Sequence, residues 1–186
     1  AATGKDFLLL SRGDSTLRGH WPMETETLRD ILEAKSGKHY DGEVIYPFFP
    51  EGGRYTLDDV HYVKQGDMLV PAGQTEFARD KSFGYTASSL PDWCEEKSGG
   101  RYPSADCCRI SLEELRAGNT DDIAARLETV SGFGILHLHG KLAGKLVISK
   151  GCFNIAAHRT MTAVFPMAAT LLQTVFTAKS ITKLTA

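Results

Sequence analysis

Short apolar runs, each ending in a polar or glycine-rich turn, alternate along this chain with helix-like stretches, and this alternation is the strongest constraint on its fold. Residues 7–12, 43–49 and 133–139 form three such runs. An apolar run of this length is typical of a strand that is covered on both faces, as in a parallel sheet. The alternation therefore predicts a Rossmann-like α/β fold, in which a mostly parallel sheet lies between two layers of helices.

The stretches between these runs carry helix signals. Pro22 marks the first turn of one helix, whose apolar residues recur at helical spacing until Ser36 and Gly37 end it. A second helix is expected over residues 90–97, and Ser111 begins a third with the spacing of a capping box. These helices supply the outer layers of the predicted fold.

Two regions depart from this alternation. Short apolar stretches on either side of a Gln-Gly-Asp turn predict a β-hairpin insertion around residues 55–75. Beyond residue 140 the pattern weakens: residues 146–148 suit a strand, and apolar residues from Met161 to Phe176 predict an amphipathic helix that Pro166 interrupts. We expect residues 1–186 to form a single α/β domain, with 140–186 as a closing segment of unassigned structure.

Charge and cysteine content exclude several classes of protein. The 186 residues include 21 basic and 23 acidic side chains, which leaves no basic surplus for a nucleic acid or an anionic membrane. No apolar stretch is long enough to span a bilayer, and no signal peptide is recognisable. The four cysteines lack the spacing of a disulfide framework or a zinc site, so we expect reduced thiols in a cytoplasmic protein. Because the chain begins without Met, close to a strand, it is expected to be a segment of a longer protein.

A polar segment, residues 14–19, directly follows the first apolar run. It places Asp14, two hydroxyl groups and Arg18 where a buried strand reaches the surface. This combination suits an anionic polyol, because acids and hydroxyls bind sugar hydroxyls while a guanidinium holds a carboxylate or phosphate with two parallel hydrogen bonds. The alternative is a solvated turn in which Ser15 or Thr16 only caps the next helix.

Two further features bear on a ligand site. The second apolar run ends in the loop Glu51-Gly52-Gly53-Arg54, a second position for ligand contact at a strand end. His137 and His139 share one face of the third strand, which suits either a metal pair or structural histidines. Because no third ligand is evident nearby, no metal site is predicted. Arg79 and Asp80 are interpreted as an ion pair at the start of a helix.

Four stretches, in the same order, resemble the N-terminal sugar-binding domain of the four-carbon acid sugar kinase family. They are residues 12–20, 49–54, 75–80 and 93–97, and the resemblance extends over about residues 7–139. It implies a two-domain kinase whose N-terminal domain holds threonate, erythronate or 3-oxo-tetronate. The C-terminal nucleotide-binding domain would hold ATP, and Mg²⁺ would assist phosphoryl transfer between the domains.

The resemblance and the residue types together give a set of candidate site residues. Asp14 is a candidate general base as well as a substrate contact. Arg18 or Arg54 would bind the carboxylate of the acid, since four carbons offer few other atoms to hold. Relatives usually carry Lys at the position of Arg12. The full substrate-binding set is Arg12, Asp14, Ser15, Thr16, Arg18, Gly19, Glu51, Gly53 and Arg54.

Two departures from the family pattern limit what this chain is expected to do alone. Relatives carry an Asp-Asp-x-Thr-Gly turn on an earlier strand that this sequence does not include, and no glycine-rich phosphate loop followed by Lys and Ser or Thr is present. We therefore expect a sugar-acid-binding half of a kinase, without ATP or Mg²⁺ bound to this chain alone. The alternatives are a non-catalytic sensing or interaction domain and a truncated relative, and self-association into a homo-oligomer is left open.

Overall fold

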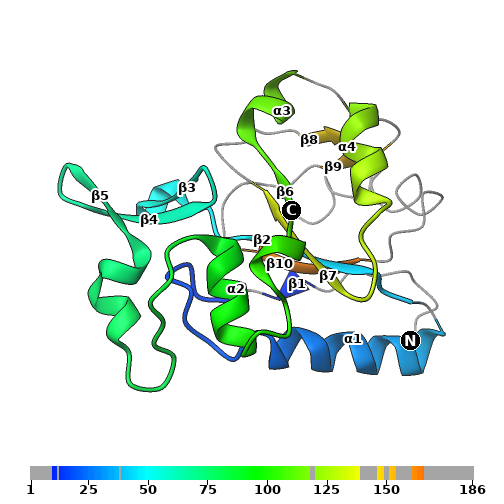
Figure 1. Ribbon diagram of the computed structural model, residues 1–186, viewed down its shortest axis with the longest axis horizontal. Helices are drawn as coiled ribbons and strands as arrows, with labels where there is room; N and C mark the ends of the chain where they lie inside the picture. Colours follow the sequence, from blue (N-terminus) through cyan, green and yellow to red (C-terminus); the bar gives the residue numbers. More distant parts are fainter. Residues whose placement is uncertain are drawn as a thin grey trace, which may run out of the picture.

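The fold is built around a five-stranded sheet whose strands lie in the order β1-β10-β2-β7-β6 (Figure 1). The structure, a computed structural model, describes residues 10–11, 13–37, 39–117, 120–138, 146–148, 151–153 and 161–165. The strands of the central sheet, in spatial order, are Leu10–Ser11, Met161–Phe165, Gly42–Tyr46, Gly134–Leu138 and Cys108–Ile110.

Strand directions confirm the mostly parallel sheet, with one exception. β2 pairs with β7, and β7 with β6, in parallel. β10 runs antiparallel to both β1 and β2, so β1 points the same way as β2. The helix predicted from Met161 to Phe176 is therefore wrong for residues 161–165, which form β10. Thr162 and Val164 are β-branched, and the segment ends before Pro166, which suits a short strand between two partners.

Helices cover both faces of the central sheet. Figure 1 shows α1 on one face and α3 and α4 on the other, which confirms the three-layer α/β fold. Ser111 and Glu114 form the predicted capping box. The Ser111 N–H donates to the Glu114 carboxylate at 2.7 Å, and the Glu114 N–H donates to the Ser111 hydroxyl at 3.2 Å. Within the described part of the chain, no helix has the length and apolar character needed to cross a membrane. The helices are α1 (Met23–Ser36), α2 (Leu90–Ser98), α3 (Leu112–Ala117) and α4 (Thr120–Leu127).

A second, antiparallel sheet, here called the side sheet, lies beside the central one. It contains β3 (Arg54–Leu57), β4 (Val60–Gln65) and β5 (Met68–Pro71) in that order. The predicted hairpin insertion is thus confirmed as β4 and β5, and β3 extends it to three strands. Of the closing segment 140–186, the structure describes β10 and the antiparallel pair β8 (Leu146–Ile148) and β9 (Gly151–Phe153).

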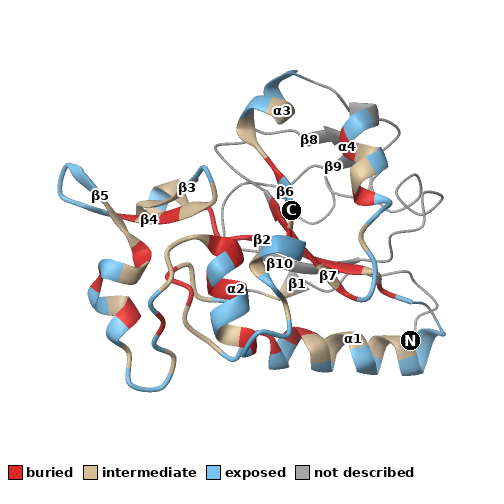
Figure 2. Ribbon diagram, in the orientation of Figure 1, coloured by how far each residue is buried: buried red, intermediate tan, exposed pale blue. Residues whose placement is uncertain are grey.

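The hydrophobic core joins the central sheet to α2. Figure 2 shows buried residues along β2, β7 and α2, whereas the tip of the side sheet is exposed. Trp93 of α2 is buried in this core and stacks against Trp21, with ring centroids 4.8 Å apart. Leu17, from the turn after β1, belongs to the same buried cluster. The segment that carries the candidate ligand residues is therefore attached directly to the core.

One acid lies inside this core. Glu43, the second residue of β2, is fully buried, and its Oε1 accepts a hydrogen bond of 2.8 Å from Trp21 Nε1. Burial raises the pKa of Glu43 to about 8, although hydrogen bonds from Trp21 and Thr25 act in the opposite direction. Glu43 is thus a protonated acid at neutral pH.

We predict that Glu43→Gln changes how stability depends on pH. From pH 4.5, the ordinary pKa, up to about pH 8, the unfolded chain releases the Glu43 proton while the folded chain keeps it. Stability of the unsubstituted protein therefore falls as pH rises through this window, by up to about 1.4 kcal/mol per pH unit. Glu43→Gln removes that contribution. Urea unfolding at several pH values, compared with the exposed control Glu113→Gln, checks this, and equal slopes for all three proteins would contradict it.

Candidate functional site

The loop between β1 and α1, residues 13–20, is here called the site loop, and it is organised around one carboxylate. Asp14 accepts hydrogen bonds from Thr16 N at 3.1 Å, Thr16 Oγ1 at 2.5 Å and Arg18 Nε at 2.6 Å. Helix α1 starts after Pro22 and has no side-chain cap. The alternative that Ser15 or Thr16 caps this helix is therefore wrong, because the Thr16 hydroxyl binds Asp14 instead.

Two hydrogen bonds from distant segments hold the backbone of the site loop. His61 Nε2 donates to the Ser15 carbonyl at 2.8 Å, and the Tyr85 hydroxyl donates to the Thr16 carbonyl at 2.5 Å. Immediately after them, Leu17 has a φ of 65°, a left-handed conformation that is unfavourable for a residue with a branched side chain. Its side chain is 4% exposed. Burial of Leu17 and the two carbonyl contacts together stabilise this turn.

His61 takes part in this arrangement as a neutral ring. A carbonyl oxygen only accepts, so Nε2 carries the proton, and Nδ1 accepts from the Thr56 hydroxyl at 3.0 Å. Burial is the main cause that lowers the pKa of His61 to about 4, and the charge of Arg54 adds to it. The side sheet thus contacts the site loop through a histidine that stays uncharged at neutral pH.

The two predicted arginines converge on one aromatic ring. The guanidinium carbon of Arg18 lies 5.2 Å from the centroid of the Phe77 ring, and that of Arg54 lies 5.4 Å from the same centroid. Arg18 comes from the site loop, Arg54 is the first residue of β3, and Phe77 lies in the short 3₁₀ turn Glu76–Arg79. Two separate segments therefore each bring a positive charge to the Phe77 ring, which a third segment supplies.

The two guanidinium groups differ in their partners. Arg18 pairs with Asp14 at 2.6 Å and, through Nη1, with Asp80 at 3.6 Å. Arg54 Nη1 donates to the Gly52 carbonyl, while Arg54 Nε is buried without a hydrogen-bond partner. Arg18 is thus largely compensated by neighbouring carboxylates, whereas Arg54 keeps an unsatisfied donor.

Both acids beside Arg18 are ionised. Partial burial raises the pKa of Asp14, but hydrogen bonds from Thr16 and Arg18 outweigh it and leave the pKa below the ordinary 3.8. Backbone N–H groups of Phe83 and Ser82 lower the pKa of Asp80. The predicted Arg79–Asp80 ion pair is wrong, because Asp80 pairs with Arg18, which folding brings to it.

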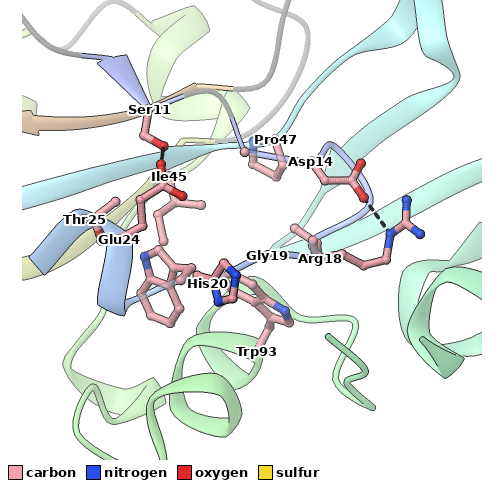
Figure 3. Close-up of a pocket in the computed structure, with 13 residues that line it drawn as sticks. Ser11, Asp14, Arg18, Gly19, His20, Glu24, Thr25, Ile45, Pro47 and Trp93 are labelled. Carbon is pink, nitrogen blue, oxygen red and sulfur yellow. Dashed lines mark hydrogen bonds and ion pairs between the residues drawn. The ribbon is translucent and has the colours of Figure 1, made fainter. Parts of the chain in front are cut away.

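A small pocket lies against the site loop, with a cavity volume of about 50 Å³. Figure 3 shows Asp14 and Arg18 at one end, and Ser11 and Glu24, whose side chains hydrogen-bond at 2.5 Å, at the other. Of the predicted residues, Asp14, Arg18 and Gly19 line it. The volume admits a few waters or one end of a small ligand.

The remaining predicted residues occupy different surroundings. Gly19 and Gly53 have φ values of 138° and 75°, so both positions favour glycine and shape the two loops. Ser15 is half-buried and uses its carbonyl to bind His61. Glu51 is exposed on the 3₁₀ turn Pro50–Gly52, and Arg12 lies outside the described residues.

Four residues of this region were not recognised as site residues from the sequence. Phe77 and Asp80 lie within residues 75–80, one of the stretches that resemble the family, and this resemblance was the only sequence signal that could have indicated them. His61 and Tyr85 lie in or after the inserted side sheet, where no local pattern indicates a contact with the site loop. They are Phe77, Asp80, His61 and Tyr85.

The histidine pair considered for a metal is only partly described. His137 is fully buried in β7, and its Nε2 lies 3.7 Å from Cys94 Sγ, whereas His139 lies outside the described residues. Among the side chains that the structure places, no group of three His, Cys, Asp or Glu residues has the proximity of metal ligands. His137 therefore belongs to the core in this structure.

We predict that Tyr85→Phe lowers the free energy of unfolding by about 1–3 kcal/mol, because the buried Thr16 carbonyl loses its donor. Chemical denaturation measures this change. Tyr62→Phe, on the partly exposed part of β4, serves as the control and should change stability much less. Equal effects of the two substitutions would show that the Tyr85 hydrogen bond does not hold the site loop.

One comparison with known proteins found a match to this chain. A family model described as a sugar-binding N-terminal domain matches residues 1–138. No match was found among curated proteins or among solved structures. The matched region contains the site loop, the side sheet, Phe77 and α2. The chain belongs to the family of sugar-binding N-terminal domains, which form the N-terminal part of four-carbon acid sugar kinases.

Proposed function

We propose that this domain binds a four-carbon sugar acid, such as threonate, erythronate or 3-oxo-tetronate, and is the substrate-binding half of an ATP-dependent kinase. The main support is the convergence of Arg18 and Arg54 on the Phe77 ring from separate loops. A four-carbon acid has one permanent charge and few atoms, so a pair of guanidinium groups is an effective anchor for it.

Within this pair, we assign the carboxylate to Arg54. Its Nε donor is buried and has no partner in the protein, so a carboxylate oxygen would satisfy it and remove a desolvation cost. The planar guanidinium offers neighbouring N–H groups, which match the two oxygens of a carboxylate. Arg18 already binds Asp14 and Asp80, so it has less capacity for a further anion.

Sugar hydroxyls would be held by the acidic side of the site. Asp14 and Asp80 are ionised acceptors on either side of Arg18, and the Thr16 hydroxyl adds a group that both donates and accepts. A carboxylate whose pKa lies below 3.8 is a weak base. We therefore propose that Asp14 orients the acceptor hydroxyl by accepting its hydrogen bond.

ATP and Mg²⁺ are assigned to the C-terminal nucleotide-binding domain of the complete kinase. The described residues do not fit Mg²⁺, since they contain no cluster of three acidic, His or Cys side chains, and the sequence has no glycine-rich phosphate loop. The contribution of this domain is to hold the acid in one orientation, which is a large part of what phosphoryl transfer requires.

We predict that Arg54→Ala weakens binding of the preferred four-carbon acid by about 10- to 150-fold, the loss of one charge-assisted contact worth about 1.5–3 kcal/mol. Isothermal titration calorimetry with threonate and erythronate measures this. Arg54→Lys should recover only part of the affinity, because an ammonium group cannot make the two parallel hydrogen bonds.

The matched control is Arg116→Ala, which removes the same charge from an exposed position at the end of α3. It should bind the acid as the unsubstituted chain does. The absence of heat with every four-carbon acid, or equal losses for Arg54→Ala and Arg116→Ala, would overturn the proposal.

A further inference from the structure

The small pocket beside the site loop contains a polar group that the proposed site does not yet use. Trp93, the fourth residue of α2, lines this pocket together with Asp14, Arg18 and Gly19. Trp93 is only 4% exposed. Its indole Nε1 is buried and has no hydrogen-bond partner among the described residues. The wall of the pocket therefore contains a hydrogen-bond donor to which this part of the chain supplies no acceptor.

The neighbouring tryptophan has the same kind of donor in a different situation. Trp21 also lines the pocket, and its ring stacks against that of Trp93 with an angle of 31° between the two planes. Trp21 Nε1 donates to Glu43 at 2.8 Å. A buried indole N–H normally has such an acceptor, because a donor that leaves water without a partner carries a desolvation cost. Trp93 departs from this rule at a position where a small molecule can approach.

The acceptors that line the pocket are engaged by other groups of the protein. Glu24 accepts a hydrogen bond from Ser11 at 2.5 Å, and Asp14 accepts three hydrogen bonds from within the site loop. Apolar side chains, among them Leu17 and Ile45, make up much of the remaining wall. In such surroundings a hydrogen bond to an entering oxygen is not weakened by competing water.

The pocket borders the proposed substrate site, because Asp14 and Arg18 belong to both. Figure 3 shows Trp93 below the site loop in this view, with Pro47 above it. The cavity volume of about 50 Å³ is too small for a whole four-carbon acid, but it admits one carbon of the chain with its oxygen. Stacking on Trp21 and burial keep the Trp93 ring in place, so its N–H is oriented before a ligand enters.

We propose that the Trp93 N–H donates to one oxygen of the sugar acid, an oxygen on the carbon chain other than the carboxylate and the acceptor hydroxyl. This inference rests on the proposed function. An indole N–H only donates, and both a hydroxyl and a keto oxygen accept, so Trp93 suits threonate, erythronate and 3-oxo-tetronate alike. A CH₂ group at the same carbon leaves the buried donor unpaired, so Trp93 selects against deoxy acids. Trp93 is thus a specificity-determining residue.

Nuclear magnetic resonance of the full chain tests the contact directly. The chain has two tryptophans and so two indole N–H signals, which the spectrum of Trp93→Phe assigns. Saturation with threonate or erythronate, whichever binds more tightly, should move the Trp93 proton signal downfield as it gains an acceptor. The Trp21 signal should move less, because its N–H already donates to Glu43. An unchanged Trp93 signal in a sample saturated with the acid would overturn the inference.

Isothermal titration calorimetry measures the selectivity. Trp93→Phe keeps an aromatic ring and removes the N–H, so it should weaken binding of the acid at least about fivefold, since the ligand oxygen is then buried without its donor. The loss should shrink to within about twofold for one of the three monodeoxy analogues, the one that lacks the oxygen in question. A loss of equal size for the acid and all three analogues, as a purely structural role predicts, would overturn the inference.

The matched control is Tyr102→Phe, which removes a polar group from a neighbouring aromatic ring. Tyr102 contacts Trp21, but it does not line the pocket, and its hydroxyl donates to Glu26 at 2.8 Å. This variant should bind the acid within about twofold of the unsubstituted chain. Circular dichroism and urea unfolding confirm that both variants are folded.

Failure of this inference and failure of the proposed function give different results. If no four-carbon acid binds the unsubstituted chain, the proposed function is wrong and the assignment of Trp93 falls with it. If an acid binds and Arg54→Ala weakens it while Trp93→Phe does not, the proposed function stands and only the assignment of Trp93 is wrong.

Discussion

The hydrogen bonds to two successive backbone carbonyls of the site loop are the interaction on which the candidate site depends. His61 binds the first carbonyl, that of Ser15, and Tyr85 binds the second, that of Thr16. Both donors come from buried positions far along the chain, so water does not replace them. Leu17 can then adopt its left-handed turn, and Arg18 leaves the loop in the direction of Phe77.

This construction explains how two guanidinium groups from separate loops both come to lie beside one aromatic ring. Each guanidinium lies close to the Phe77 ring, whose π-system attracts positive charge, and the carboxylates of Asp14 and Asp80 offset the charge of Arg18. The guanidinium groups are therefore held in position by the protein itself, so less conformational freedom would be lost if the proposed sugar acid binds. Arg54, which has the unsatisfied donor, is the part of the site that an anion would complete.

The sequence predicted those helix ends and turns that depend on residues close together in the chain. The end of α1 at Ser36, the capping box at Ser111 and the turn between β4 and β5 each follow from residues close together in the chain. Contacts between distant segments had no such signal. Asp80 pairs with Arg18 instead of its neighbour Arg79, and His61 reaches Ser15 from an inserted sheet. The strand β10 was missed for the same reason. Its apolar spacing suits a helix, but its pairing with β1 and β2 determines its conformation.

The place of β10 in the central sheet has a consequence for synthesis on the ribosome. Among the described strands, β1 pairs only with β10, yet the end of β1 at residue 11 and the start of β10 at residue 161 are 150 positions apart in the sequence. Backbone groups of β1 therefore lack their partner until residues 161–165 have left the exit tunnel, long after the site loop has been translated. The N-terminal edge of the sugar-binding region is thus completed late, by residues beyond the part that defines the family.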